Sequence, residues 1–243
     1  MLPRMYTDLA HLWPLISDPS NYAEEAAFWR EVVRKKLGPG RHHVLELGVG
    51  GGNNLSHLTA DFDATAVDLS EGMLAHSRKL NPGVEHHVGD MRTVRMGRTF
   101  NAVLIHDAIS YLISEDDIRA TMETATAHLE SGGVFVGAPD FFRETFTDSK
   151  ICHDRASDGK IELTHIEYTY DPDPADTTYE TVMFYLIREG KRLTVEQESH
   201  LFGLFSVDRW LSLMEEAGFD AETAEYPVHE DGHPGYLLVG VKR

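Results

Sequence analysis

Short apolar runs alternate with segments of helical periodicity through the first part of the chain. The runs at 44–47, 64–67, 84–88, 102–105 and 134–138 end in glycine or polar residues, which is typical of strands buried on both faces of a sheet. The spacing of apolar residues predicts helices at 21–37, 54–60, 71–80 and 115–129. This order of elements predicts a parallel sheet with helices on both of its faces.

Serine residues stand where several of these helices are expected to begin. Ser20, Ser70 and Ser114 each precede a helical segment, and Asp117 follows Ser114 by three residues, as in a capping box. We therefore expect these serines to cap the helices that begin at 21, 71 and 115.

The pattern changes at about residue 141. Strand-like runs at 161–170, 179–188 and 193–201 are separated by turn sequences at 171–174 and 189–190, which predicts an antiparallel insertion. A helix at 207–217, capped by Ser206, and strands at 221–226 and 236–241 complete the chain. The expected fold class is α/β, with a doubly wound, mostly parallel sheet of seven strands that is interrupted by the insertion.

These changes of pattern divide the chain into four segments. We expect a helical N-terminal cover at 1–43, a binding core at 44–140, the antiparallel β insertion at 141–205, and a closing helix with the last two strands of the core sheet at 206–243.

Composition and charge narrow the classes of partner. The chain of 243 residues has 22 Lys and Arg against 40 Asp and Glu, a net charge of −18, so neither nucleic acid nor an anionic membrane is an expected partner. No apolar stretch is long enough for a membrane-spanning helix, and the start lacks the apolar core of a secretory signal. The single cysteine, Cys152, excludes an internal disulfide, so a cytoplasmic location is expected.

No metal site is expected either. The histidines at 42–43 and 86–87 are adjacent pairs in predicted strands, where neighbouring side chains point to opposite faces. Neither pair can therefore form a metal site by itself.

The most informative segment is a glycine-rich turn after the first predicted strand. It reads Glu46-x-Gly48-x-Gly50-x-Gly52, and glycines at such a turn let the backbone approach a ligand closely. The dinucleotide fingerprint G-x-G-x-x-G fails here because Asn53 occupies the place of its third glycine. An NAD(P)-dependent oxidoreductase is therefore disfavoured.

Two acidic residues follow the next two predicted strands. Asp68 ends the second strand, where a carboxylate can accept both hydroxyls of a ribose. Asp90 follows the third strand in the sequence Gly-Asp-Met-Arg. In this order and spacing, together with the segments 100–103 and 129–133, these motifs resemble class I S-adenosylmethionine (SAM) methyltransferases.

The resemblance implies a Rossmann-like fold, SAM as cofactor and S-adenosylhomocysteine as product. It implies that Asp90 receives the exocyclic amine of adenine and that the following backbone amide, at Met91, binds a ring nitrogen. We expect the carbonyl of His106 to accept the amino group of SAM. The expected cofactor-binding residues are Tyr22, Glu46, Gly48, Gly50, Asp68, Leu69, Met73, Asp90, Met91 and His106.

The resemblance extends to a subgroup of the methyltransferases. The segments 6–9, 21–25, 69–74, 89–92, 140–146, 200–205 and 235–240 resemble bacterial small-molecule N-methyltransferases, such as those that dimethylate the amine of nucleotide-linked deoxyaminosugars. This implies that Tyr22 lies against the methionyl end of SAM and that Tyr6 belongs to an N-terminal lid. It also implies that the β insertion covers the acceptor site and supports a homodimer.

The chain departs from that subgroup near the acceptor. Those enzymes tend to have small or apolar residues where this chain has His106 and Asp107, and some have a histidine at the position of Tyr111. Tyr111, His106 and His200 are the candidate catalytic residues, as proton acceptors or as positioning groups. Tyr6, Asp107 and Arg143 are the candidate substrate-binding residues.

A phosphate on the substrate would need a cation. Arg143, Arg155 and Arg188 are the candidates for binding one. The acidic balance of the chain suits the cationic sulfonium cofactor better than a phosphate-bearing acceptor.

The functional hypothesis is transfer of a methyl group from SAM to a small-molecule amine, with a sugar amine as one candidate. The transfer is an in-line displacement in which proximity supplies most of the catalysis. Two alternatives remain open from the sequence: a small-molecule O-methyltransferase, and a SAM-binding regulatory protein without catalysis.

Overall fold

The computed structural model describes residues 2–226 and 235–243, and within these residues the strands form two sheets. The larger sheet has seven strands in the order β10-β11-β5-β4-β1-β2-β3. Its strands β1 to β5 are parallel, whereas β11 runs antiparallel to both β5 and β10. The strands span His43–Leu47 (β1), Asp63–Asp68 (β2), Glu85–Val88 (β3), Phe100–Ile105 (β4), Leu129–Gly137 (β5), Phe219–Tyr226 (β10) and Gly235–Lys242 (β11).

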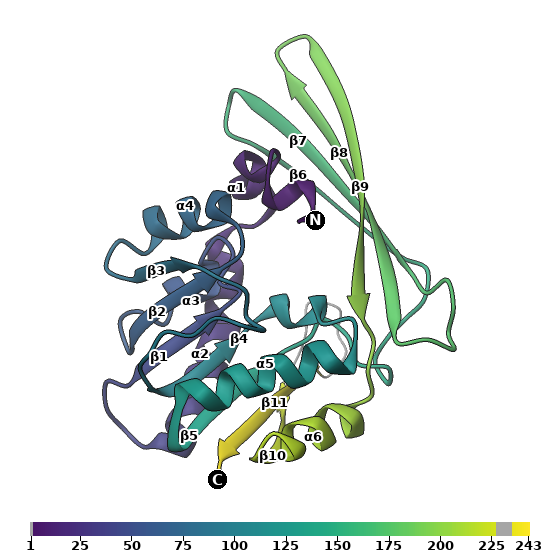
Figure 1. Ribbon diagram of the computed structural model, residues 1–243. Coiled ribbons are helices and arrows are strands. Elements are labelled where there is room, and N and C mark those ends of the chain that lie inside the picture. Colours follow the sequence, from purple (N-terminus) through teal and green to yellow (C-terminus); the bar gives the residue numbers. More distant parts are fainter. Residues whose placement is uncertain (1, 227–234) are drawn as a thin grey trace.

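Helices cover both faces of this sheet (Figure 1). They span Ala23–Leu37 (α2), Asn53–Ser56 (α3), Glu71–Leu80 (α4), Glu115–His128 (α5) and Val207–Glu216 (α6). Each face of the sheet packs against helices in its own hydrophobic cluster, because neighbouring side chains of a strand point to opposite faces. On β1, Leu45 and Leu47 pack in the cluster with α5 and α6, whereas Val44 packs in the cluster with α2, α3 and α4. The doubly wound, mostly parallel sheet predicted from the sequence is confirmed.

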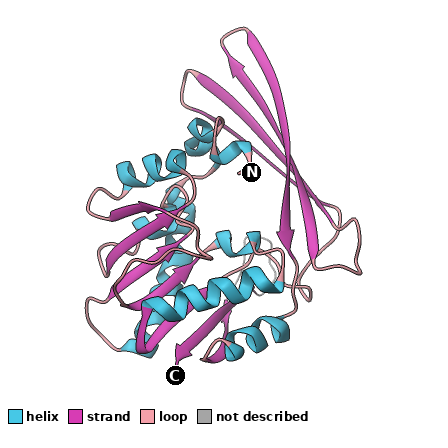
Figure 2. Ribbon diagram, in the orientation of Figure 1, coloured by secondary structure: helices cyan, strands magenta, loops and turns pink. Residues whose placement is uncertain are grey.

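A second sheet of four antiparallel strands stands apart from the core, as Figure 2 shows. Its strands span Lys150–Ser157 (β6), Ile161–Tyr170 (β7), Thr178–Glu189 (β8) and Arg192–Gly203 (β9), and all of these residues are described. The antiparallel insertion is confirmed, but strand β6 was missed. It is a polar edge strand with an exposed surface, so it has no apolar alternation to detect.

Two local predictions for the helices were wrong. The helix expected at 54–60 ends at Ser56, because His57 and Leu58 donate to the third residue before them and tighten the chain into a turn. Ser20 does not cap α2: it lies inside a 3-10 turn, Pro19–Tyr22 (η3), where the carboxylate of Asp18 accepts its N–H. The caps expected from Ser70, Ser114 and Ser206 are present.

The N-terminal residues lie between the two sheets (Figure 1). They form Arg4–Tyr6 (η1), Ala10–Leu12 (η2) and Trp13–Ile16 (α1), and another 3-10 turn, Asp107–Tyr111 (η4), follows β4. Met5, Leu9 and Leu12 are buried against Leu163 and Tyr185 of the insertion. The N-terminal segment is therefore packed on the inner face of the insertion.

No helix in the described ranges, 2–226 and 235–243, has both the length and the apolar character needed to cross a membrane.

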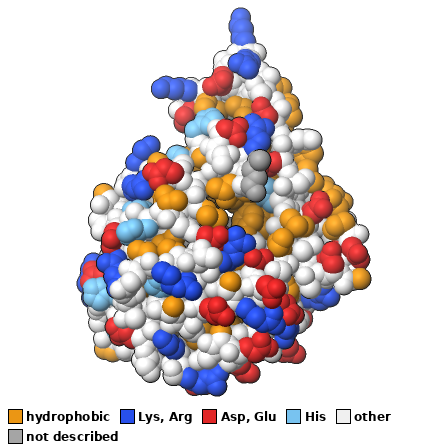
Figure 3. Space-filling view, viewed as in Figure 1, with side chains coloured by type: hydrophobic (Ala, Val, Ile, Leu, Met, Phe, Trp, Pro, Cys, Tyr) orange, Lys and Arg blue, Asp and Glu red, His pale blue; other side chains and the backbone are white. Residues whose placement is uncertain are grey.

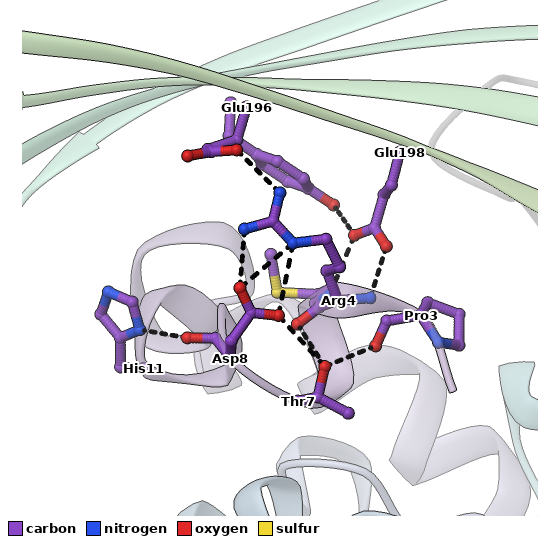
Figure 4. A network of polar contacts seen from close by, with 9 residues as sticks. Pro3, Arg4, Thr7, Asp8, His11, Glu196 and Glu198 are labelled. Carbon is purple, nitrogen blue, oxygen red and sulfur yellow. Dashed lines mark hydrogen bonds and ion pairs between the residues drawn. The ribbon is translucent and has the colours of Figure 1, made fainter. Parts of the chain in front are cut away.

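Polar contacts fix η1 to strand β9 (Figure 4). The carboxylate of Glu198 accepts the backbone N–H groups of Arg4 and Met5 at 2.6 and 2.9 Å. The Arg4 guanidinium pairs with Asp8 and with Glu196 on the more exposed side. Glu198 is thus the buried attachment point of the segment, whereas Glu196 forms a surface pair.

We predict that Glu198→Ala detaches η1 and that Glu196→Ala does not. Loss of Glu198 leaves two backbone donors without their acceptor, which costs about 1–3 kcal/mol for each buried donor, whereas a surface pair contributes little. Amide hydrogen exchange in residues 4–12 should accelerate about 10-fold or more in Glu198→Ala. Equal exchange rates in the two variants would contradict this assignment.

Candidate active site

A cavity of about 940 Å³ lies between the N-terminal segment, the insertion and the carboxyl ends of the core strands. Its size is within the roughly 300–1,000 Å³ of small-molecule sites. The order of the sheet places β1 beside β4, so the chain connections leave a crevice at this point, where ligands of open α/β sheets bind. Figure 3 shows hydrophobic side chains gathered around the hollow between the two sheets.

The glycine-rich turn after β1 forms one wall of the cavity. Gly48 has a φ of 73°, and a Cβ there would lie 2.3 Å from Cβ of Ala108, so no side chain fits. The N–H of Gly48 donates to the carbonyl of Val67 at 2.7 Å. The turn is therefore held against β2 and exposes its backbone to the cavity.

Glu46 lines the same wall and is 1% exposed. Within the described residues, its Oε2 atom has no hydrogen-bond partner. Burial raises the pKa of Glu46 to about 8. A buried carboxylate of this kind attracts a cation, and the ammonium group of an amino acid fits that requirement.

Asp68 stands at the carboxyl end of β2. Its Oδ1 accepts the N–H of Ser70 at 2.8 Å and its Oδ2 accepts the N–H of Gly50 at 2.7 Å. Burial raises its pKa, against the effect of these backbone donors. The carboxylate is thus fixed beside the glycine turn, in a position suited to accept ribose hydroxyls, and Leu69 and Met73 line the cavity next to it.

Asp90 is placed differently from Asp68. Its carboxylate pairs with Arg92 at 2.7 Å, and this guanidinium lowers the pKa of Asp90 against the opposing effect of burial. The residues before and after it, Gly89 and Met91, line the cavity, whereas Asp90 is not among the lining residues. The structure therefore brings Met91 to the site and leaves the Asp90 side chain beside it.

His106 ends β4 and lies between two carboxylates. Its Nε2 is 2.9 Å from Oε1 of Glu25, and its Nδ1 is 3.0 Å from Oδ2 of Asp107. Burial lowers the pKa of His106, but the charges of Asp107 and Glu25 outweigh it and raise the pKa well above its ordinary value. This favours a positively charged ring, which is a poor proton acceptor. The ring of Tyr22 packs against it at 5.7 Å.

A second set of polar side chains extends across the cavity from the core to the insertion. The hydroxyl of Tyr111 lies 2.8 Å from the hydroxyl of Tyr6 and 2.6 Å from Nδ1 of His200. Nε2 of His200 lies 3.3 Å from Oε1 of Glu198. The chain Tyr6–Tyr111–His200–Glu198 thus joins η1, η4 and β9.

Arg143 lies outside this group. Its guanidinium donates to the carbonyl of Asp176, and Arg143 is not among the residues that line the cavity.

The sequence did not single out Asp140, Glu25 or Glu198. Burial, with the nearby charge of Asp107, raises the pKa of Asp140 to about 8, and the Tyr179 hydroxyl donates to its Oδ2 at 3.4 Å. Asp140 lies three residues beyond the carboxyl end of β5, and Asp68 stands at the carboxyl end of β2. This signal could have found Asp140, because the carboxyl ends of parallel strands meet at one edge. Glu25 reaches the site from α2, which packs on the core sheet, and Glu198 acts on the site from β9 through its contact with His200.

Comparison of the chain with known proteins identifies the family to which this site belongs. A methyltransferase-domain family matches residues 44–133. The chain is 34% identical over 225 residues to the dTDP-3-amino-3,4,6-trideoxy-alpha-D-glucopyranose N,N-dimethyltransferase of Streptomyces venezuelae, and the match covers 91% of each protein. The chain belongs to the family of SAM-dependent N-methyltransferases.

Solved structures agree with this assignment. The methyltransferase superposes on Streptomyces venezuelae DesVI with a TM-score of 0.83 at 28% identity, over 98% of each chain. It superposes on SAM-bound CalS10, an amino pentose methyltransferase from Micromonospora echinaspora, with a TM-score of 0.77 at 25% identity, over 91% and 92% of the two chains. The predicted family and the SAM cofactor are confirmed. The roles of individual site residues stay predictions.

We predict that Glu46→Gln stabilises the methyltransferase without SAM as the pH rises. The raised pKa of Glu46 means that its protonated form is favoured in the folded state, so its contribution to stability is present below the ordinary value of 4.5 and is lost as the pH rises through about 8. Glutamine does not titrate. The free energy of unfolding of the variant should therefore gain on that of the wild type between about pH 5 and about pH 8.

Urea unfolding at several pH values measures this difference. The exposed Glu123→Gln is the matched control and should follow the wild type. A constant difference between wild type and Glu46→Gln across the pH range would refute the assignment.

Proposed function

We propose that the acceptor is a small-molecule amine and that the polar chain from Tyr111 to Glu198 takes up its proton. The observation that carries this proposal is that Tyr111 and His200 line the same cavity as the glycine turn, and are hydrogen-bonded to one another at 2.6 Å. The relatives, which are named as N,N-dimethyltransferases of aminosugars, support an amine over a hydroxyl acceptor.

The residues of the cofactor wall fit SAM. The unpartnered carboxylate oxygen of Glu46 suits the ammonium of its methionyl part, Asp68 suits its ribose hydroxyls, and the backbone at Met91 suits its adenine. When bound, SAM supplies a methyl group activated by a positive sulfur. The protein then has to align the acceptor with that methyl and exclude water.

The proton has a defined route in this arrangement. An acceptor that enters as an ammonium would first give up a proton, and the lone pair left on its nitrogen would then form the bond to the methyl carbon as the bond from that carbon to sulfur breaks. The oxygen of Tyr111 takes this proton while its own hydroxyl proton passes to Nδ1 of His200. The resulting imidazolium has its other nitrogen beside the carboxylate of Glu198.

His106 is proposed as an electrostatic and positioning group. A ring whose pKa the carboxylates of Asp107 and Glu25 raise is a poor proton acceptor. The backbone carbonyl of His106 accepts the N–H of Ile109 at 3.0 Å and has a second lone pair for the amino group of SAM. Asp107 is in turn proposed to face the acceptor, because it lines the cavity next to Tyr111.

A homodimer through the insertion is the proposed assembly. The outward face of the insertion sheet carries apolar side chains that are more than a third exposed, which supports a partner surface there. They are Ile151, Tyr168, Leu193, Val195 and Leu201. The cytoplasmic location expected from the sequence stays a prediction.

The first test is SAM binding. We predict that Asp68→Ala weakens SAM binding by about 10- to 150-fold, the loss expected for hydrogen bonds to a charged group. Asp116→Ala, whose side chain is 97% exposed, is the control and should bind as the wild type does. Calorimetric titration gives the affinities. Absence of SAM binding by the wild type at millimolar concentration would refute the function.

The second test concerns the proton acceptor. We predict that His200→Asn and Tyr111→Phe each lower kcat by about 10²- to 10⁴-fold with SAM affinity unchanged. Tyr6→Phe leaves the bond between Tyr111 and His200 in place and should cost less.

The enzyme is supplied with SAM and with each member of a panel of amines and phenols, and the release of S-adenosylhomocysteine is followed. Its rate gives kcat, and the compounds that react identify the acceptor atom. If phenols alone are methylated, the enzyme is an O-methyltransferase. If SAM binds and no acceptor reacts, the regulatory alternative holds.

A further inference from the structure

The part of the cavity beyond the cofactor wall has an acidic lining. It contains the carboxylates of Glu25, Asp107, Asp140, Asp154 and Glu167. Among the described residues, Lys150 is the one lysine or arginine that lines the cavity, and its Nζ lies 5.7 Å from the ring centroid of Phe141. The segment 227–234 adds no lysine or arginine in the sequence.

The arginines that the sequence offered for a phosphate are paired elsewhere. Arg143 donates to the backbone carbonyl of Asp176. Arg155 and Arg188 both pair with the carboxylate of Glu162. None of the three lines the cavity within the described part of the chain.

Two arginines that are sequence neighbours of cavity-lining residues, Arg4 and Arg92, are also paired. Arg92 is held between Asp90 and Asp117 at 2.7 and 2.8 Å. Arg4 is held by Asp8 and Glu196 on the outer side of η1. Carboxylates therefore outnumber lysine and arginine around a bound acceptor, and the positively charged ring of His106 is already paired with Glu25 and Asp107.

A phosphate group would bind weakly in such a site. Proteins bind phosphates through arginine, lysine or several backbone N–H groups, and like charges brought together in an interface weaken binding. The apolar part of the wall is formed by aromatic rings instead: Tyr179 stacks on Phe202 with centroids 5.1 Å apart, and Phe141 meets Tyr179 edge-on at 5.5 Å. This lining suits an ammonium group on an uncharged body.

We propose that the methyltransferase acts on an amine whose scaffold carries no phosphate, in contrast to the nucleotide-linked sugars in the names of its curated relatives. This inference rests on the proposed function, since it names the class of acceptor for that site. Asp107 and Asp140 attract the amine, and the rings of Tyr179 and Phe202 contact its uncharged body.

Binding of the nucleotide part alone gives the first test. Thymidine diphosphate is titrated calorimetrically into the enzyme saturated with S-adenosylhomocysteine, after SAM binding has been measured on the same preparation. We expect no saturable binding up to about 1 mM. Saturable binding below that concentration, lost in Lys150→Ala, would overturn the inference, because Lys150 would then serve a phosphate.

Turnover gives the second test. One aminosugar is supplied in two forms, as the thymidine diphosphate sugar and as the methyl glycoside, and release of S-adenosylhomocysteine is followed. We expect kcat/KM to be about 10-fold or more higher for the methyl glycoside, and a preference for the nucleotide form would overturn the inference. If neither form reacts, the binding test alone decides, whereas failure to bind SAM refutes the proposed function instead.

Removal of the negative charge gives a third, independent comparison. Measured above about pH 8, where the Asp140 carboxyl is ionised, Asp140→Asn takes away one of the repelling carboxylates, so it should increase the affinity for thymidine diphosphate about 10-fold if repulsion excludes this ligand. Glu123→Gln, on the exposed face of α5, is the matched control and should change nothing. An unchanged affinity in Asp140→Asn would contradict exclusion by charge.

Discussion

The carboxylate of Glu198 holds the N-terminal segment to two strands of the insertion, β8 and β9. It accepts the backbone N–H groups of Arg4 and Met5 and the hydroxyl of Tyr185, and it faces Nε2 of His200. Burial raises its pKa, but His200, Tyr185 and the N–H of Arg4 outweigh this and keep the pKa below its ordinary value, so the group stays charged. One buried charge therefore closes the N-terminal segment over the cavity and orients the histidine inside it.

This arrangement couples closure of the cavity to the state of the proposed proton acceptor. When η1 is docked, Tyr6 reaches Tyr111 and Glu198 is shared between the segment and His200. If η1 detached, Tyr111 would lose its bond to Tyr6, and water would reach the ring of His200. A docked segment is therefore a condition both for excluding water and for a defined hydrogen-bond direction along the chain.

The buried carboxyl groups of this site lower the stability of the protein without ligands and favour the binding of cations. Glu46 and Asp140 are buried carboxyls whose pKa values burial raises to about 8 in each case, so ionising them costs free energy in the protein without ligands. A cationic cofactor on one side and an amine on the other would recover that cost. This is the usual relation between a functional site and the stability of its fold.

The sequence predicted the elements whose signals are local. The caps Ser70, Ser114 and Ser206 and the buried strands follow from short patterns, and so does the glycine turn. It failed at β6, which has no apolar alternation, and at the end of α3, where the chain tightens after Ser56. It also missed Glu25 and Glu198, because nothing near them in the sequence marks their approach to the cavity.

The same distinction explains how one architecture can serve different acceptors. Packing of the core sheet and the insertion is fixed by apolar positions spread over the whole chain, and it persists at 28% identity with DesVI. The acceptor wall depends on a few side chains at strand ends, such as Asp107 and Asp140, and on whether any arginine reaches them. A change of charge at so few positions leaves the fold and the cofactor wall intact while changing which molecule can enter. The charge of the wall is therefore a better guide to the acceptor of this enzyme than its fold.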